Sequence, residues 1–251
     1  MTFHEFGEPS RDTVVLLHGG GLSWWNFREV AELLQNGFHV VVPVLDGHAG
    51  SDRGFTSIED NAAEIISFID ERFGGHVKLV GGLSLGAQVL VEMLCRHGDV
   101  CSYAVVESAA VIPSLVTNLL TSPAFGLSYG LVKNRSFAKL QFKSLKIKPE
   151  LFEDYYHDTC AISKADMVAF MKASTGYRLK DTFGSVAAQV FVFYGGKETR
   201  VIRRSAEEMR KALPGCTVRR LEGLYHGEFS INRAGEYAET LKTILEEGGV
   251  R

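Results

Sequence analysis

Residues 77–86 read VKLVGGLSLG, and this stretch decides how the rest of the chain is interpreted. An apolar run of strand type leads directly into the pentapeptide Gly82-Leu83-Ser84-Leu85-Gly86, and an amphipathic stretch from Ala87 to His97 follows. A serine in a Gly-x-Ser-x-Gly pentapeptide between a strand and a helix lies on a strained turn, where glycines let neighbouring backbone approach closely. This context predicts an exposed nucleophilic hydroxyl at Ser84.

The chain contains a second pentapeptide of the same form, Gly126-Leu127-Ser128-Tyr129-Gly130. The residues before it, Ser122-Pro123-Ala124-Phe125, lack the character of a strand, so the strand-to-helix turn is not expected there. We therefore assign the nucleophile to Ser84 rather than to Ser128. A tight turn without chemistry is the alternative interpretation of residues 82–86.

Short, wholly apolar runs alternate along the chain with amphipathic stretches of helical period. The runs cover residues 14–17, 40–44, 77–80, 103–106 and 190–194, with a more polar run at 217–221, and the helical patterns cover 57–73, 87–97, 203–213 and 234–247. Strands that are apolar on both faces are typical of a parallel sheet covered by helices. The alternation predicts an α/β fold with a doubly wound, mostly parallel sheet, helices on both faces, and residues 217–221 near an edge.

One long segment, residues 113–184, interrupts this alternation because it contains several short helical patterns and no strand-like run. It lies between the fourth and fifth apolar runs. Ligands of doubly wound sheets bind at the carboxyl ends of the strands. We therefore expect residues 1–112 and 185–251 to form the core, and residues 113–184 to form a helical cap or lid over the ligand site.

The first half of this insertion has an uneven charge distribution. Between Pro113 and Pro149 the chain has no acidic residue but six basic ones, Lys133, Arg135, Lys139, Lys143, Lys146 and Lys148, and then Glu150, Glu153, Asp154 and Asp158 follow. One interpretation is a basic helix that faces an acidic neighbour in water. The other is a lid that attracts an anionic substrate or rests on an anionic surface.

Composition and charge exclude several classes of protein. The 251 residues are 45% hydrophobic and 23% charged, and 27 basic against 30 acidic residues give a net charge of −3, so no global field attracts nucleic acid. The N-terminus lacks the pattern of a signal peptide, and no apolar stretch of about 18 residues predicts a membrane span. The four cysteines have neither metal nor disulfide spacing, which favours free thiols in a reducing cytoplasm and no metal site.

A serine hydroxyl needs a base, and the base needs an orienting carboxylate. Among the eight histidines, His226 follows the last apolar run and a short loop, which places it at the carboxyl end of the sheet. Two carboxylates follow strands at the same end, Glu198 beyond residues 190–194 and Glu107 beyond residues 103–106. Glu198 follows the strand expected beside the last one and gives the chain order Ser, Glu, His, so we assign it as the acid, with Glu107 as the alternative.

Attack on a carbonyl creates an oxyanion that requires preorganised N–H donors. Leu85, which opens the helix after Ser84, can supply one donor, and Gly20 or Gly21 in the loop after the first apolar run can supply the second. His18, immediately before these glycines, is expected to hold the loop by hydrogen bonding.

Trp24 and Trp25 follow this loop directly. We expect them, together with Gly21, to border the substrate pocket. Packing of the two indoles in the core, under the helix that follows, is an equally good interpretation.

The motifs occur in an order that resembles the α/β-hydrolase fold serine hydrolases. They are His18-Gly19-Gly20-Gly21, Leu45-Asp46-Gly47-His48-Ala49-Gly50-Ser51-Asp52, Gly82 to Gly86, Gly195 to Glu198 and His226-Gly227, and the resemblance covers roughly residues 1–112 and 185–251. It implies an eight-stranded sheet, a Ser-His-acid triad and no cofactor. Because only Thr2 to Phe6 precedes the first apolar run, we expect a seven- to eight-stranded sheet.

The resemblance implies hydrolysis of a small-molecule carboxylester or thioester through an acyl-enzyme. A serine at the turn argues against relatives that use aspartate there, the haloalkane dehalogenases and epoxide hydrolases. Hydrolysis of a C–C bond, acyl transfer and a non-catalytic ligand-binding role on the same fold are the alternatives.

Overall fold

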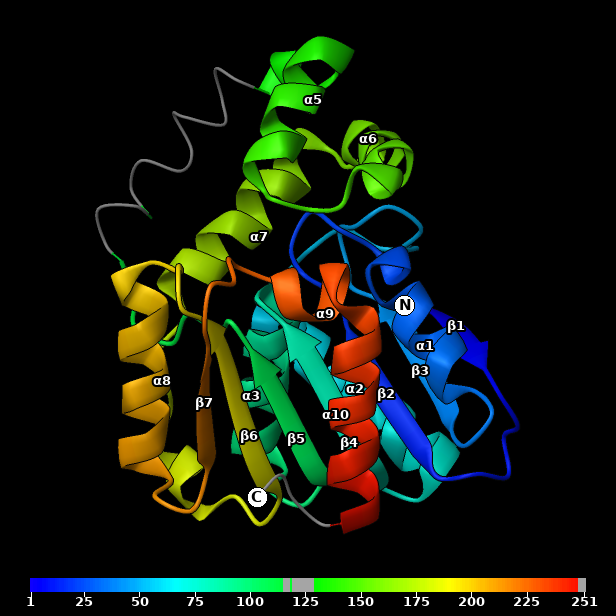
Figure 1. Cartoon of the computed structure of the whole chain (residues 1–251), viewed down its shortest axis with the longest axis vertical. Helices are drawn as coiled ribbons and strands as arrows, with labels where there is room; N and C mark the ends of the chain where they lie inside the picture. The colour runs from blue at the N-terminus through cyan, green and yellow to red at the C-terminus, as the bar shows by residue number, and fades with distance from the viewer. Residues whose placement is uncertain (115–117, 119–128, 248–251) are drawn as a thin grey trace.

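The structure, a computed structural model, describes residues 1–114, 118 and 129–247. In this part of the chain seven strands form one sheet (Figure 1). The strand order is β1-β3-β2-β4-β5-β6-β7, with β1 antiparallel to β3 and all other neighbours parallel. The strands are β1 (Thr2–Phe6), β2 (Thr13–Leu17), β3 (His39–Val44), β4 (Val77–Leu83), β5 (Cys101–Glu107), β6 (Gln189–Gly195) and β7 (Thr217–Leu221). The predicted mostly parallel α/β sheet is confirmed, with seven strands.

The central strands are buried on both faces of the sheet. In β2, Val14 and Leu16 pack on one face, Val15 and Leu17 pack on the other, and none of the four is exposed. Successive side chains of a strand point to opposite faces, so an unbroken apolar run requires helices on both sides. The more polar β7 lies at an edge of the sheet, as its sequence predicts.

Helices cover the two faces in separate groups (Figure 1). On one face α1 contacts α10, and on the other α2 contacts α3 while α8 packs against β6. These helices are α1 (Arg28–Leu34), α2 (Ile58–Phe73), α3 (Leu85–Arg96), α8 (Arg200–Ala212) and α10 (Ala234–Glu247), and the short segments η1 (Trp24–Phe27) and α9 (Glu228–Asn232) lie on the α1 side.

Local sequence explains where these helices begin and end. The Ser57 hydroxyl accepts a hydrogen bond from the Asp60 amide at 2.9 Å and caps α2, which ends at Gly74 in the left-handed conformation. Helix α3 starts at Leu85, two residues before the predicted start, because the turn at Ser84 leads directly from the end of β4 into the helix.

The described part of the segment between β5 and β6 is mostly helical. Its described elements are α5 (Arg135–Ser144), η2 (Pro149–Leu151), α6 (Phe152–Ala161), α7 (Lys164–Gly176) and η3 (Asp181–Ser185). Helices α5, α6 and α7 lie beyond the carboxyl ends of the strands (Figure 1), whereas η3 packs near Gly98 at the amino ends of the strands. Side chains of α6 reach the core, since Asp158 accepts a hydrogen bond from the Trp25 indole at 2.7 Å and Asp154 pairs with Arg28 at 2.8 Å. Ser128 of the second pentapeptide lies outside the described residues.

Candidate active site

Ser84 occupies the turn between β4 and α3 in a conformation that non-glycine residues rarely adopt, with φ 54° and ψ −110°. Its amide donates a hydrogen bond to the Glu107 carbonyl of the neighbouring strand at 2.9 Å. Both flanking glycines are required by space. A Cβ on Gly82 would lie 2.6 Å from the Gly86 carbonyl oxygen, and a Cβ on Gly86 would lie 2.1 Å from the Leu17 carbonyl oxygen. The backbone thus holds the hydroxyl at the carboxyl end of the central strand.

His226 and Glu198 are hydrogen-bonded to each other, with 2.7 Å between Nδ1 and Oε2. The other oxygen of Glu198 accepts hydrogen bonds from the Gly195 amide and the Ser108 hydroxyl, both at 2.7 Å. The Glu198 side chain is 1% exposed, whereas the imidazole is 49% exposed. The carboxylate is therefore held by three donors, and because it binds Nδ1 it leaves Nε2 of His226 unengaged.

The electrostatics of Glu198 favour its ionised form. Burial opposes ionisation, but the hydrogen bond and charge of His226, together with the donors Gly195 and Ser108, outweigh it and lower the pKa of Glu198 from its ordinary value. A carboxylate that stays ionised can orient a neutral imidazole and stabilise the imidazolium that forms when the base takes up a proton.

Ser84, His226 and Glu198 line one cavity of about 640 Å³. The loop that carries the histidine also packs on the turn that carries the serine, because a Cβ on Gly227 would lie 3.2 Å from the Leu83 side chain. Most of the remaining wall is apolar, contributed by Leu22, Leu83, Leu145, Ile147, Met171, Ile202 and Ile231. The cavity suits an organic molecule with a substantial apolar part.

Two backbone amides, those of Leu85 and Gly20, lie near Ser84, and Gly20 also lines this cavity. Leu85 is the first residue of α3, where N–H groups have no acceptor within the helix. Gly20 is its neighbour in space, since a Cβ on Gly20 would lie 3.4 Å from the Leu85 Cβ. Within the described part of the chain neither amide donates a hydrogen bond, so both are available to an oxyanion.

The chain matches the sequence family described as the alpha/beta hydrolase family over residues 14–240. The chain belongs to the alpha/beta hydrolase family. Solved structures of this fold resemble it over nearly its full length. A thermophilic esterase from Thermogutta terrifontis is 16% identical with a TM-score of 0.79, and covers 98% of this chain and 93% of its own. A structure from work on the carboxylesterases of Nitrososphaera gargenis is 17% identical with a TM-score of 0.80, at 99% and 96% coverage.

An enol-lactonase from Burkholderia xenovorans LB400 is similar to the same extent, with 17% identity, a TM-score of 0.76, and coverage of 97% of this chain and 95% of its own. At this level of identity the likeness concerns the fold. Among the described helices of this alpha/beta hydrolase, none has the length and apolar character needed to cross a membrane.

In this hydrolase His18 is a structural residue of the glycine loop, as expected. Its Nε2 accepts a hydrogen bond from the Leu45 amide at 3.0 Å, and its Nδ1 donates to the Gly19 carbonyl at 2.9 Å. Burial, with a smaller contribution from the neighbouring His48, lowers the pKa of His18 to about 3, so the ring is neutral at physiological pH.

Glu107, the alternative acid, forms no hydrogen bond with His226 in this hydrolase. One of its oxygens lies 3.4 Å from the Ser230 amide in α9, and burial raises the pKa of the carboxyl to about 7. Its main contribution to the site is through its backbone, which binds the Ser84 amide.

The structure does not bring Gly21, Trp24 and Trp25 to the cavity wall. Trp25 is 3% exposed and packs in the core, where its indole binds Asp158 of α6. Trp24 stacks on the His4 ring, with 4.3 Å between ring centroids. The contacts of Trp25 therefore agree with the core interpretation, whereas Trp24 is only partly buried. The sequence could not indicate the acceptor of the Trp25 indole, because Asp158 lies 133 residues further along the chain.

Ser108 is a site residue that sequence reasoning missed. It follows β5 with φ 60°, its amide donates to the Phe193 carbonyl at 2.9 Å, and its hydroxyl donates to Glu198. A polar residue just beyond an apolar strand was the available signal, but only the sheet order shows that β5 and β6 are neighbours.

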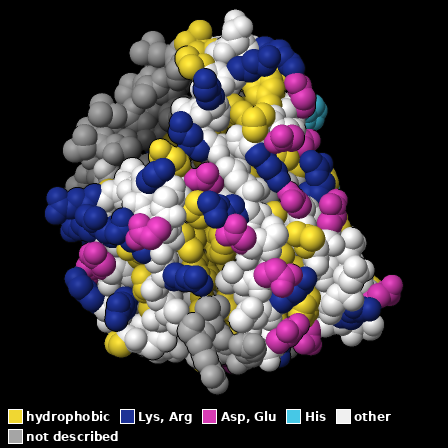
Figure 2. Space-filling view, viewed as in Figure 1, with side chains coloured by type: hydrophobic (Ala, Val, Ile, Leu, Met, Phe, Trp, Pro, Cys, Tyr) yellow, Lys and Arg dark blue, Asp and Glu magenta, His cyan; other side chains and the backbone are white. Residues whose placement is uncertain are grey.

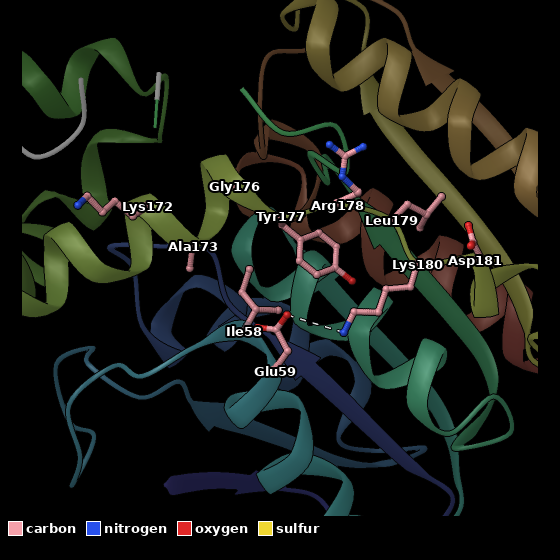
Figure 3. A pocket seen from close by; sticks show the side chains of 10 residues that line it. All are labelled: Ile58, Glu59, Lys172, Ala173, Gly176, Tyr177, Arg178, Leu179, Lys180 and Asp181. Carbon is pink, nitrogen blue, oxygen red and sulfur yellow. Dashed lines mark ion pairs between the residues drawn. The ribbon is translucent and has the colours of Figure 1, made fainter. Parts of the chain in front are cut away.

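A second cavity, of about 690 Å³, is lined by none of the three residues Ser84, His226 and Glu198 (Figure 3). Tyr177 and Lys180 of its wall belong to a network around Glu92, a fully buried carboxylate of α3 that binds Arg96 at 2.7 Å, the Tyr177 hydroxyl at 3.2 Å and the Lys180 ammonium. Lys180 also lies 3.7 Å from Glu59 of α2, the ion pair drawn in Figure 3. These charges satisfy one another, so they link α2 and α3 to the segment after α7 rather than form a reactive site.

Proposed function

We propose that this protein is a serine hydrolase that cleaves a carboxylester or thioester of a small molecule, with Ser84 as nucleophile, His226 as base and Glu198 as orienting acid. The observation that carries the proposal is the 2.7 Å hydrogen bond between His226 and Glu198 beside the strained turn of Ser84, with all three residues lining one cavity. Strained backbone positions and buried titratable groups cluster at functional sites, and here both line one cavity.

The first half of the proposed reaction forms an acyl-enzyme. The Nδ1–H group of His226 donates a hydrogen bond to Glu198, so Nε2 carries the lone pair that takes the proton from the Ser84 hydroxyl. The serine Oγ attacks the carbonyl carbon, and the oxyanion accepts hydrogen bonds from the amides of Gly20 and Leu85. The intermediate collapses with release of the alcohol or thiol, which takes its proton from His226.

The second half repeats these steps with water as the nucleophile. His226 takes a proton from water, the hydroxide adds to the acyl carbon, and the new tetrahedral intermediate expels Ser84, which regains its proton from His226. The free acid then leaves the cavity.

Residues 113–184 act as a cap in this proposal. Leu145 and Ile147, which follow α5, and Met171 and Thr175 of α7 supply part of the wall of the cavity that contains Ser84. Since these elements belong to the segment between β5 and β6, they would select the acyl or leaving group while the core supplies the catalytic groups.

A series of p-nitrophenyl esters with acyl chains of two to twelve carbons tests the proposed activity. We expect hydrolysis by the wild-type protein and no hydrolysis above background by Ser84→Ala. Ser144→Ala is the matched control, because Ser144 lines the same cavity but does not lie on the turn. Equal activity of Ser84→Ala and the wild-type protein would contradict the proposal.

A further inference from the structure

Two exposed lysine side chains approach the same aromatic ring at the cavity, beside His226. Lys146 follows α5 and Lys197 follows β6, and both line the cavity that contains Ser84. Their ammonium nitrogens lie 5.6 Å and 4.7 Å from the centroid of the Tyr225 ring, and Tyr225 immediately precedes His226. Two positive charges thus converge on one aromatic ring next to the proposed base.

Within the described residues, neither lysine forms an ion pair with a carboxylate. Arg135 of the same basic segment differs, because it pairs with Glu153 of α6. The carboxylate next to Lys197 in sequence, Glu198, is already bound by His226, Ser108 and Gly195. The two ammonium groups are therefore available to an anion in the cavity.

The backbone of Lys146 is an unusual place for a lysine. The residue follows the last turn of α5 with φ 60°, a left-handed conformation that glycine or asparagine adopts at lower cost at the end of a helix. The Asn232 side chain, on the helix after His226, donates a hydrogen bond to the Lys146 carbonyl at 2.6 Å. This contact ties the lysine to the element that follows the proposed base.

The cavity combines these charges with an apolar wall. Leu145 and Ile147 flank Lys146 in sequence, and Met171, Ile202 and Ile231 also line the cavity. On the face shown in Figure 2, Lys and Arg side chains lie among apolar ones over the upper part of the molecule. A molecule with an apolar stem and one negatively charged end would satisfy both parts of the site.

We infer that Lys146 and Lys197 determine substrate specificity by binding an anionic group, so that the substrate is an ester of an apolar chain that ends in a carboxylate or a phosphate. This inference rests on the proposed hydrolase function, because it places the anion in the cavity of Ser84. An ammonium group acts as a point charge and a donor of hydrogen bonds, so it accepts either anion.

Equilibrium binding to the Ser84→Ala variant tests this inference without turnover. Isothermal titration calorimetry compares monomethyl heptanedioate, which carries one carboxylate, with dimethyl heptanedioate, which is neutral and has the same chain. We expect the anionic ester to bind about tenfold more tightly at low salt, and this preference to shrink as ionic strength rises. Monohexyl phosphate forms a third arm, and tighter binding than that of the carboxylate would identify phosphate as the preferred anion.

Substitution of both lysines, Lys146→Met with Lys197→Met, in the Ser84→Ala background should reduce the ratio of the two dissociation constants to about one. Lys139→Met with Lys143→Met is the matched control, because these lysines lie on α5 and do not line the cavity. The control should keep the tenfold ratio.

Equal affinities of the two esters in the parent variant, no binding of either ester, or an unchanged ratio after substitution of Lys146 and Lys197 would each overturn the inference. Hydrolysis of neutral p-nitrophenyl esters by the wild-type protein is measured separately. If that hydrolysis persists while charge preference is absent, the inference fails and the proposed hydrolase function stands.

Discussion

Replacement of Glu198 by glutamine should inactivate the enzyme through the tautomer of His226. Oε1 of Glu198 accepts two hydrogen bonds at 2.7 Å, from the Gly195 amide and the Ser108 hydroxyl, whereas Oε2 accepts one from His226. In the variant the amide oxygen is expected to keep the position with two donors, which turns the amide NH₂ toward Nδ1. An NH₂ group can only donate there, so Nδ1 must carry the lone pair and Nε2 the proton.

A protonated Nε2 cannot take the proton from Ser84, so the loss should be large. A comparable change of Asp to Asn lowers kcat by about 10⁴ in a well-studied triad, which corresponds to about 5.5 kcal/mol in the activation free energy. We expect Glu198→Gln to reduce kcat for a p-nitrophenyl ester by about the same factor. The assay is steady-state hydrolysis, with circular dichroism to show that the variant is folded.

Glu107→Gln is the matched control, because Glu107 lies at the end of the neighbouring strand and forms no hydrogen bond with His226. Its kcat should remain within a fewfold of the wild-type value. If Glu107→Gln is inactive and Glu198→Gln keeps more than a tenth of the wild-type kcat, the reasoning is refuted and the roles of the two carboxyls must be exchanged.

Three further predictions follow from the geometry. Ser84→Ala should lower kcat by about 10⁶ and leave the thermal unfolding temperature unchanged. Ser128→Ala should retain activity, and an inactive Ser128→Ala variant would contradict the assignment of the nucleophile. Gly20→Val should lower kcat by at least 10² in a folded protein. Its Cβ would already lie in contact with Leu85, at 3.4 Å, so its two methyl groups would crowd the loop, and a wild-type kcat would show that this loop does not bind the oxyanion. Burial raises the pKa of Glu107 from 4.5 to about 7, so between pH 4.5 and pH 7 the folded state binds more protons than the unfolded state. The free energy of unfolding of the wild-type protein should therefore fall by about 3 kcal/mol as pH rises through this range. In Glu107→Gln this fall should be absent in urea titrations at pH 5 and pH 8, and an equal fall in both proteins would refute the assignment.

Features that depend on nearby residues could be predicted from the sequence. The turn at Ser84 follows from a strand, two glycines and a helix in succession, and the Ser57 cap of α2 follows from its position before an amphipathic stretch. The hydrogen bond of His226 with Glu198 could be predicted if β6 and β7 are neighbours, which their succession in the chain suggests. The short stretch Thr2–Phe6 before the first apolar run indicated a sheet of as few as seven strands, and the structure shows that this stretch is the antiparallel edge strand β1.

Features that depend on distant residues could not be predicted. The Trp25 indole is buried because Asp158 supplies an acceptor, and Ser108 joins the site because it lies beside Glu198, 90 residues away in sequence. The basic segment was visible in the sequence, but periodicity does not show that Lys146 reaches the cavity while Arg135 pairs with Glu153.

The central claim is that Ser84 is an activated nucleophile, and covalent labelling by a fluorophosphonate probe followed by mass spectrometry of the digested protein tests it most directly. Activation requires His226, so the wild-type protein should carry one probe adduct on the peptide that contains Ser84, and the His226→Ala variant should label at least a hundredfold more slowly. An adduct on another serine, or equal labelling rates in the wild-type protein and His226→Ala, would contradict the account.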